Sequence, residues 1–419
     1  MSFWKIDLKN PLIPLCFVIL IDHIGMGIIF PILVPIFMES NGILGAGIAE
    51  STQSFWYNVT LSIYPIFAFF GAAILGSLSD QFGRKKVLVF CLLGSALGYF
   101  LSGFAIDIQN IPLLIFSRAL AGLTAGSFPV AQAAVIDIST EDNKASNIGL
   151  ILLSASIGFL VGPLLGSFCS NSNILDWFYY STPLYCASIL ALINIVLLRV
   201  FKETFVPKAP LKKNVFKKSI ELLLAPIQLK HIRYLSLIFL FMQFGWGFYF
   251  QFISVYLLKK HDFSSQDIGY FMSFMGVGFA LGSCWILRIL SKYFRDVSLA
   301  IGILITVMFT MFMTIIELPW FIILGASVLL GCTWAVAYSI LIKLFSSLVS
   351  EEEQGFIMGV AESLVFVAFA ITPMLNTYLE SLDISIPLIV AILSVGIGSV
   401  LLFRWKSVKQ TRIALGQTH

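Results

Sequence analysis

Long apolar runs, separated by short polar segments, make up most of the chain. A helix needs about 20 predominantly apolar residues to cross the hydrocarbon core of a bilayer. Twelve runs approach or exceed this length, at residues 12–37, 54–78, 87–106, 111–137, 147–168, 182–201, 232–258, 267–291, 297–316, 319–345, 355–378 and 385–404. They are apolar throughout rather than in alternation, which excludes the strands of a membrane β-barrel. The pattern therefore predicts an all-α membrane protein with twelve transmembrane helices.

The longest polar stretch divides the predicted helices six and six. It predicts an N-terminal six-helix bundle at residues 1–201, a cytoplasmic linker at 202–231, and a C-terminal six-helix bundle with a short cytoplasmic tail at 232–419. An amphipathic piece around residues 215–224 is expected to lie along the inner membrane surface. Attraction to anionic lipid explains the lysines of the linker, so no nucleic-acid partner is expected.

The two halves repeat each other weakly. The fifth predicted helix contains Gly149 and Pro163, and the eleventh contains Gly359 and Pro373 at the same separation. Internal duplication of this kind is typical of transporter folds. It predicts two pseudo-symmetric bundles around a central cavity.

Composition and charge agree with a membrane location. Of the 419 residues, 58% are hydrophobic and 11% are charged, whereas soluble domains carry about 25% charged residues. Lys and Arg concentrate in alternate connecting segments, which places both termini in the cytoplasm. The first apolar run is too long for a signal peptide and is expected to act as its own insertion signal in the inner (cell) membrane.

The cysteines and acidic residues indicate neither a metal site nor a cofactor. The six cysteines have no C-x-x-C spacing and no histidine partners. Cys169 and Cys186 lie near the outer ends of neighbouring helices, so a disulfide between them is one alternative and packing as small hydrophobic residues is the other. The glycine-rich runs lack a Gly-Lys-Ser/Thr sequence, which disfavours ATP-driven transport.

A charged turn at residues 76–88 separates the second and third apolar runs. It reads GSLSDQFGRKKVL, with small residues on both sides that permit close approach of helix ends. It resembles the loop between helices 2 and 3 of the major facilitator superfamily. The matching positions are Gly76, Leu78, Asp80, Gly83, Arg84 and Lys85.

The resemblance implies a gating function for this loop. It implies that Asp80 lies at the start of the eleventh helix, where the helix dipole favours an anion. It also implies that Arg84 pairs with Asp137 at the end of the fourth helix. Together these contacts would close the inner side of the outward-facing state. An ordinary positively charged turn would need only the basic residues.

The fifth predicted helix carries glycines at four-residue spacing. Such a face lets another helix pack at close range, and the proline permits a bend. The residues are Gly149, Gly158, Gly162, Pro163 and Gly166, followed by Ser167. They resemble the antiporter motif of the drug:proton antiporter branch of the superfamily, in which a glycine replaces Ser167. General small-residue packing is the alternative explanation.

Two charged residues lie deep in predicted helices. Asp22 is in the first helix, and Arg118 is in an R-x-x-x-G element of the fourth that is similar to one in the family. Both are estimated to lie near mid-membrane, where a charge is costly without a partner. Residues 22–31 resemble the first helix of tetracycline-type efflux proteins, which implies a proton-coupling pair. A static ion pair is the alternative, and His23 is expected to be a hydrogen-bonded packing residue.

Glu362 is the other acid expected to be buried, in the eleventh helix. It is either a second proton site, a contact for a cationic substrate, or a neutral acid bonded to a neighbouring helix. The family places helices 1, 4, 7 and 10 around the cavity, and aromatic and amide side chains suit amphiphilic ligands. The candidate cavity residues are Phe128, Gln132, Gln243, Trp246, Gln251, Trp334 and Tyr338.

These features predict a secondary transporter rather than an enzyme. The expected activity is proton-coupled export of a small organic molecule, with protons and lipid as the other partners and a monomer as the working unit. The main alternative is a proton-coupled uptake permease for a metabolite or a siderophore. A membrane enzyme would need a polar catalytic cluster, and a sensor would be expected to carry a large soluble domain; neither is visible in the sequence.

Overall fold

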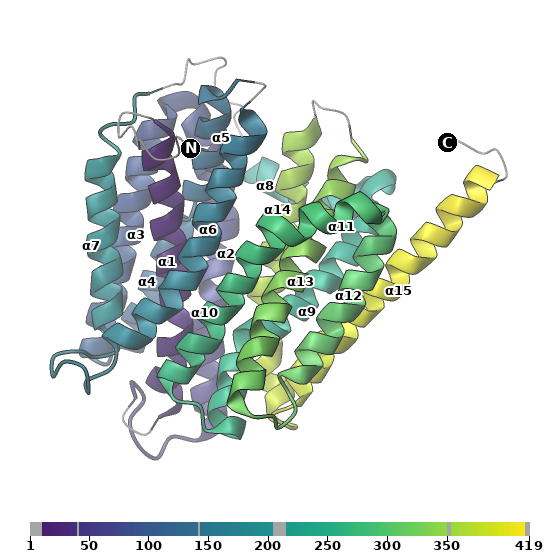
Figure 1. Cartoon of the computed structure of the whole chain (residues 1–419). Helices are drawn as coiled ribbons and strands as arrows, with labels where there is room; N and C mark the ends of the chain where they lie inside the picture. The colour runs from purple at the N-terminus through teal and green to yellow at the C-terminus, as the bar shows by residue number, and fades with distance from the viewer. Residues whose placement is uncertain (1–10, 40–41, 141–142, 204–214, 350–352, 415–419) are drawn as a thin grey trace, which may run out of the picture. The chain divides into compact units, whose positions relative to one another are not determined.

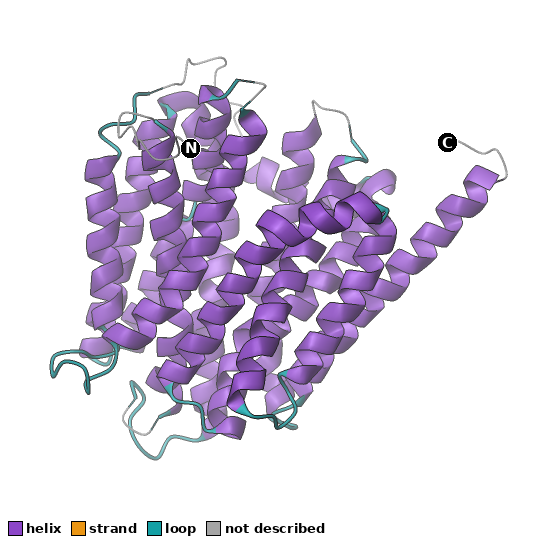
Figure 2. Cartoon of the chain, viewed as in Figure 1, coloured by secondary structure: helices purple, strands orange, loops and turns teal. Residues whose placement is uncertain are grey.

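The computed structural model describes residues 11–39, 42–140, 143–203, 215–349 and 353–414. In these residues the regular elements are helices, and no strand occurs among them (Figures 1 and 2). The first helices are α1 (Leu12–Met38), α2 (Glu50–Phe82), α3 (Arg84–Asp107), α4 (Ile111–Leu123), α5 (Ser127–Ile138), α6 (Lys144–Cys169) and α7 (Thr182–Leu197). The others are α8 (Val215–Gln228), α9 (Lys230–His261), α10 (Ser265–Leu281), η1 (Gly282–Ile286), α11 (Leu287–Tyr293), α12 (Asp296–Met313), α13 (Trp320–Ser346), α14 (Gln354–Glu380) and α15 (Ile386–Ala414).

Contacts divide the chain into two compact units. The first consists of Met1–Ala46 and Ile66–Lys217, and the second of Gly47–Pro65 and Lys218–His419. The boundary near residue 217 falls inside the predicted linker 202–231, of which residues 204–214 lie outside the described part. The chain order alone did not indicate that residues 47–65 group with the second unit.

The first unit is built around α1 and α3. Helix α1 packs against α5, α6 and α7, and α3 packs against α4, α5 and α7. Their shared core consists of aliphatic side chains such as Leu15, Ile19, Leu88 and Val130, all nearly inaccessible to solvent. Because lipid is as apolar as this core, close packing rather than water exclusion holds such helices together.

The second unit is built around α9, the most buried of its long apolar helices. Helix α9 packs against α14 and α15, while α13 packs against α10 and α12. The N-terminal half of α2 joins this unit through side chains. The Tyr57 hydroxyl donates a hydrogen bond to the backbone oxygen of Gln251 at 3.0 Å, and Lys259 pairs with Glu50 at 2.9 Å.

The helices match the predicted membrane segments, with three differences. Eleven are long and apolar enough to span a bilayer, and the sixth predicted segment contains only the 16-residue α7. The eighth contains a five-residue π-helix, η1, between α10 and α11. The fourth, predicted to be continuous over 111–137, is broken between Leu123 and Ser127 into α4 and α5.

The break in the fourth segment has a local cause. Pro129 lacks a backbone N–H, so it cannot donate to a residue four positions earlier. The Thr124 hydroxyl bonds to the backbone oxygens of Leu120 at 3.0 Å and Ala121 at 3.2 Å, offering the carbonyls an alternative to the helical pattern. Gly126 meets the side chain of Leu75, which leaves no room for a Cβ atom.

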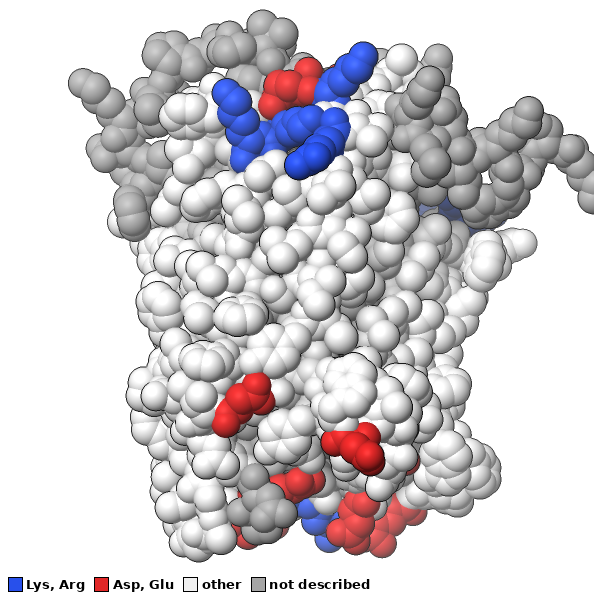
Figure 3. Space-filling model, turned by 90° about the vertical axis from the view of Figure 1, so that its left-hand side faces the viewer, with Lys and Arg blue, Asp and Glu red and all other residues white. Residues whose placement is uncertain are grey.

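Charged side chains avoid the middle of the face drawn in Figure 3. Lys and Arg gather mainly at one end of this face and most Asp and Glu at the other, with a broad band of other residues between them. Such a band is what the hydrocarbon core of a bilayer requires. The basic end corresponds to the side that the sequence pattern assigns to the cytoplasm.

Candidate functional site

The turn between α2 and α3 requires glycine at position 83. Gly83 has φ +101°, a conformation that residues with a Cβ atom rarely adopt. A Cβ atom there would also collide with the Glu203 carboxylate. Gly76, by contrast, has no other group within 4 Å of the position that a Cβ would take. The expected close approach of helix ends therefore does not occur at Gly76.

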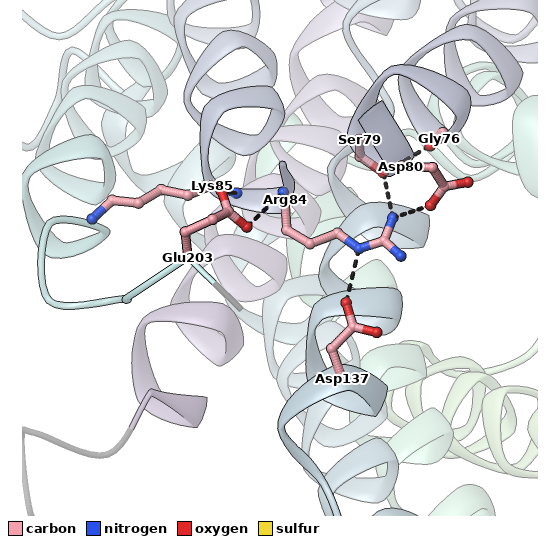
Figure 4. Close-up of polar contacts among 7 residues, drawn as sticks. All are labelled: Gly76, Ser79, Asp80, Arg84, Lys85, Asp137 and Glu203. Atoms are coloured by element: carbon pink, nitrogen blue, oxygen red, sulfur yellow. Dashed lines mark hydrogen bonds and ion pairs between the residues drawn. The ribbon is translucent and has the colours of Figure 1, made fainter. Parts of the chain in front are cut away.

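Arg84 is the centre of the polar contacts in this turn (Figure 4). Its Nη1 donates to Asp80 Oδ1 at 2.5 Å and to Ser79 Oγ at 2.6 Å, and its Nε donates to Asp137 Oδ2 at 3.0 Å. The Arg84 side chain is 10% exposed, against 58% for Asp80 and 30% for Asp137. The structure therefore contains the Arg84–Asp137 ion pair, which ties the turn to the end of α5.

Glu203 completes this cluster, and sequence reasoning missed it. Its Oε1 accepts from the backbone N–H of Arg84 at 2.9 Å, and its Oε2 accepts from that of Lys85 at 3.1 Å. These N–H groups open α3, where Gly83 supplies no capping side chain. The Lys85 ammonium in turn donates to the backbone oxygens of Arg199 and Phe201. The sequence offered two separate signals: a helix start at Gly83 without a capping side chain, and an acid, Glu203, within a lysine-rich stretch. Nothing in the sequence linked the two, because Arg84 and Glu203 are 119 residues apart.

Asp22 lies part-buried in α1, opposite the break between α4 and α5. Its Oδ2 accepts a hydrogen bond from Ser127 Oγ at 2.9 Å. Ser127 is the first residue of α5 and is 1% exposed. Arg118 is buried in α4, and its pairing with Asp22 stays a prediction.

His23 is a packing residue in this structure. Its Nδ1 lies 2.9 Å from the backbone oxygen of Ile19. Its ring meets the rings of Phe128 and Phe159 edge to face, with centroids 5.5 and 5.3 Å away. The side chain is thus held by α1, α5 and α6, within electrostatic reach of the Asp22 carboxylate.

Three of the predicted glycines lie directly against α1. A Cβ atom on Gly158 would come 2.7 Å from the backbone oxygen of Leu20, and one on Gly162 would come 2.6 Å from that of Ile24. A Cβ atom on Gly166 would come 2.8 Å from the backbone oxygen of Ile28. Pro163 is buried beside Gly27 of the same helix pair. Gly149 is exposed, with nothing within 4 Å of its Cβ position, so the close contact covers only part of the motif.

Cys169 and Cys186 of the first unit are neighbours. Cys169 ends α6 and Cys186 lies in α7, and both thiols are free. Their sulfur atoms are close enough to interact. Nearby, the Tyr180 hydroxyl donates to Glu39 at 3.0 Å, and burial raises the pKa of Tyr180.

In the second unit, Glu362 lies on α14 between the buried residues Ala361 and Ser363. Its side chain is accessible to solvent but is surrounded by protein atoms. The expectation that it is an enclosed acid therefore stays a prediction. The Glu362 charge acts electrostatically on the hydroxyl of Tyr338 on α13.

The candidate cavity residues of this unit separate into two groups. The Trp246 and Trp334 rings are stacked at 4.3 Å with an interplanar angle of 12°, and both are buried. Gln251 is also buried, with its amide bonded to the backbone oxygen of Phe369 and to Thr372. These side chains, with the buried Gln243, pack inside the unit, whereas Tyr338 is half-buried, as are Phe128 and Gln132 in the first unit.

Within the described residues, no group of His, Cys, Asp and Glu side chains is arranged to hold a metal ion. The polar groups predicted from the sequence that the structure describes are Asp22 and the ion-paired turn around Arg84 in the first unit, and Glu362 in the second.

Comparisons with known proteins agree on the family. The profile of the Major Facilitator Superfamily matches residues 15–373. The class H tetracycline resistance protein of Pasteurella multocida is 28% identical over 197 residues, which cover 47% of this chain and 46% of that protein. The quinolone resistance protein NorA of Staphylococcus aureus is 26% identical over 381 residues, which cover 90% of this chain and 92% of that protein. The match therefore spans less than half of the tetracycline resistance protein but most of NorA.

A solved structure supports the fold. The crystal structure of the human organic anion transporter MFSD10 (TETRAN) superposes with a TM-score of 0.70 at 18% sequence identity, covering 95% of this chain and 100% of that chain. At this identity the likeness is evidence for the fold alone. Because the family profile covers most of the sequence and the helices follow the same fold, the chain belongs to the Major Facilitator Superfamily.

Proposed function

We propose that the chain exports a small organic molecule in exchange for protons, by alternating access across the cell membrane. The observation that carries this proposal is the part-buried Asp22 carboxylate in the middle of α1, bonded to Ser127. An ionisable side chain inside a membrane helix is costly and is retained chiefly where it moves ions or binds substrate. Asp22 is therefore our coupling carboxylate, with Arg118 as its expected counter-charge.

Two further features support a moving transporter. The glycine face of α6 contacts α1 backbone to backbone at Gly158, Gly162 and Gly166, so few side chains interlock between these helices. At the basic end of the first unit, Arg84 holds Asp80 and Asp137 together. We propose that this turn is the gate expected from the family resemblance, and that its ion pairs exchange partners during the cycle.

The direction and the first probes come from the relatives. The names of the matched proteins refer to resistance to tetracycline and to quinolones. We therefore propose export rather than uptake, and tetracycline and a quinolone as the first compounds to test. Uptake of a metabolite or a siderophore is the alternative that the same experiments would reveal.

The test uses everted vesicles from cells that produce the full chain. When the vesicle lumen is more acidic than the medium, the wild-type protein should accumulate one of the two probes in the lumen. Collapse of the pH gradient should stop this accumulation. Asp22→Asn should abolish this uphill flux, because an amide cannot bind and release a proton. Exchange of probe without a gradient should survive, since the amide resembles the protonated acid in size and polarity.

Asp176→Asn is the matched control, because Asp176 is exposed in the loop between α6 and α7, far along the chain from the proposed site. It should transport at the wild-type rate. Proton-driven flux in Asp22→Asn at the wild-type rate would move the coupling site elsewhere, with Glu362 the next candidate. Accumulation in right-side-out vesicles instead would establish uptake.

A further inference from the structure

The break in the fourth membrane segment brings the start of a helix to Asp22. Helix α4 ends at Leu123 and α5 begins at Ser127, and the residue before it, Gly126, has no side chain with which to cap the new helix. In a continuous helix, the backbone N–H groups of Ser127 and Phe128 would be bonded to carbonyls one turn earlier. At a helix start they are free of that pattern, and the local dipole favours an anion.

The side chain of Ser127, the first residue of α5, points toward Asp22. It is 1% exposed, and its hydroxyl hydrogen is donated to Asp22 Oδ2 at 2.9 Å. A hydroxyl has one hydrogen to donate, and an ionised carboxylate can only accept. This bond therefore stabilises the ionised form of Asp22 relative to the protonated form.

The other titratable or charged groups around Asp22 come from three helices. His23 follows it on α1 and acts on it electrostatically, with its Nδ1 2.9 Å from the backbone oxygen of Ile19. Cys91 of α3 lies within electrostatic reach of the carboxylate, and Arg118 of α4 is its expected counter-charge. Helix α6 contributes the glycine face at Gly158 and Gly162 and the ring of Phe159 in this region, none of which is ionisable. Among the residues that the structure describes, Ser127 is thus the hydroxyl donor to the Asp22 carboxylate. Arg118 is expected to add a positive charge.

We propose that Ser127 is a positioning residue for the proton site: its hydroxyl holds the ionised Asp22 carboxylate at the start of α5, and this hold weakens when Asp22 takes up a proton. The inference rests on the proposed role of Asp22 and goes beyond it, because it assigns part of the control of protonation to the broken segment. The only covalent bond made or broken is the carboxyl O–H bond of Asp22, and its proton is exchanged with water.

The experiment follows the protonation of Asp22 directly and needs no substrate. The purified full chain in lipid is titrated with pH, and the infrared carbonyl band of the protonated carboxyl is recorded. The band that belongs to Asp22 is the one absent from Asp22→Asn. Removing a hydrogen bond to a charged group in Ser127→Ala should move the midpoint of this band upward by about one pH unit.

Two variants separate this role from a structural one. Ser127→Thr keeps the hydroxyl and should titrate near the wild-type midpoint. Ser117→Ala removes another buried hydroxyl of the same segment, one that lies 2.7 Å from Ser102 Oγ and donates to Leu114 rather than to Asp22. It should leave the midpoint unchanged. If Ser127→Ala does not fold, Ser127→Cys, whose thiol is a weak donor, should still show an upward shift.

A wild-type midpoint in Ser127→Ala, or in Ser127→Cys where that variant replaces it, would overturn the inference. This failure is distinct from failure of the proposed function. If Asp22→Asn loses proton-driven flux while Ser127→Ala titrates normally, Asp22 couples transport without help from Ser127. If the Asp22 band does not titrate in the wild-type protein, both proposals are wrong.

Discussion

The two glycines of the turn between α2 and α3 differ in whether they can be replaced by a residue with a side chain. Gly83 combines a positive φ with contact to the Glu203 carboxylate, whereas Gly76 has open space around its Cβ position. Sequence comparison with the family treats the two glycines alike. The structure distinguishes them, because one lies at a helix start and the other inside α2.

Gly83→Ala should destabilise the protein, while Gly76→Ala should not. Alanine at positive φ costs about 1–2 kcal/mol, and its Cβ would displace the carboxylate that caps α3. Alanine inside a helix is instead favoured over glycine by about 0.5–1 kcal/mol. Thermal unfolding of both variants in detergent checks this. Equal melting temperatures for the two would show that the turn relaxes and that Glu203 is not essential to it.

At the scale of elements, the closely packed glycine face of α6 was the most predictable feature of the site. Glycines at four-residue spacing indicate a close helix contact, and Gly158, Gly162 and Gly166 make one with α1. The identity of the partner helix and the isolation of Gly149 were not predictable, because spacing within one helix does not say which neighbour it meets.

Gly162→Leu should impair transport, with Gly149→Leu as its control. A leucine at 162 would press on the backbone of Ile24 and Gly27, and overpacking of this kind costs about 1–3 kcal/mol. At 149 it would enter open space. Size-exclusion chromatography should show that both variants are folded. Transport into vesicles should be lost only in Gly162→Leu. Full activity of Gly162→Leu would mean that α1 and α6 separate easily.

At the scale of the whole molecule, contacts rather than chain order define the two units. The N-terminal half of α2 belongs with the second unit through Tyr57 and Glu50, and its C-terminal half with the first. The gate that we propose at the inner end of α2 should therefore affect transport more than folding, since Asp80 is more than half exposed.

Asp80→Asn should slow transport without lowering the melting temperature. An exposed ion pair contributes about 0–1 kcal/mol to stability. In contrast, losing a charge-assisted bond from one state of a two-state gate should slow the cycle by about tenfold or more. Initial rates in vesicles, normalised to the amount of folded protein, test this, with Asp176→Asn again as the matched control. A wild-type rate in Asp80→Asn would remove the gating role.

The sequence alone determined the membrane class, the number of apolar segments and the Arg84 turn, because hydrophobic length and a dense local motif are properties of contiguous residues. Contacts between residues distant along the chain were decided only in the tertiary structure. Glu203 caps a helix that begins 119 residues earlier, and Ser127 reaches Asp22 across 105 residues. The burial of Trp246 likewise depends on which helix faces meet neighbours. An apolar segment with hydrophobic residues on all sides carries no periodicity from which those faces can be inferred.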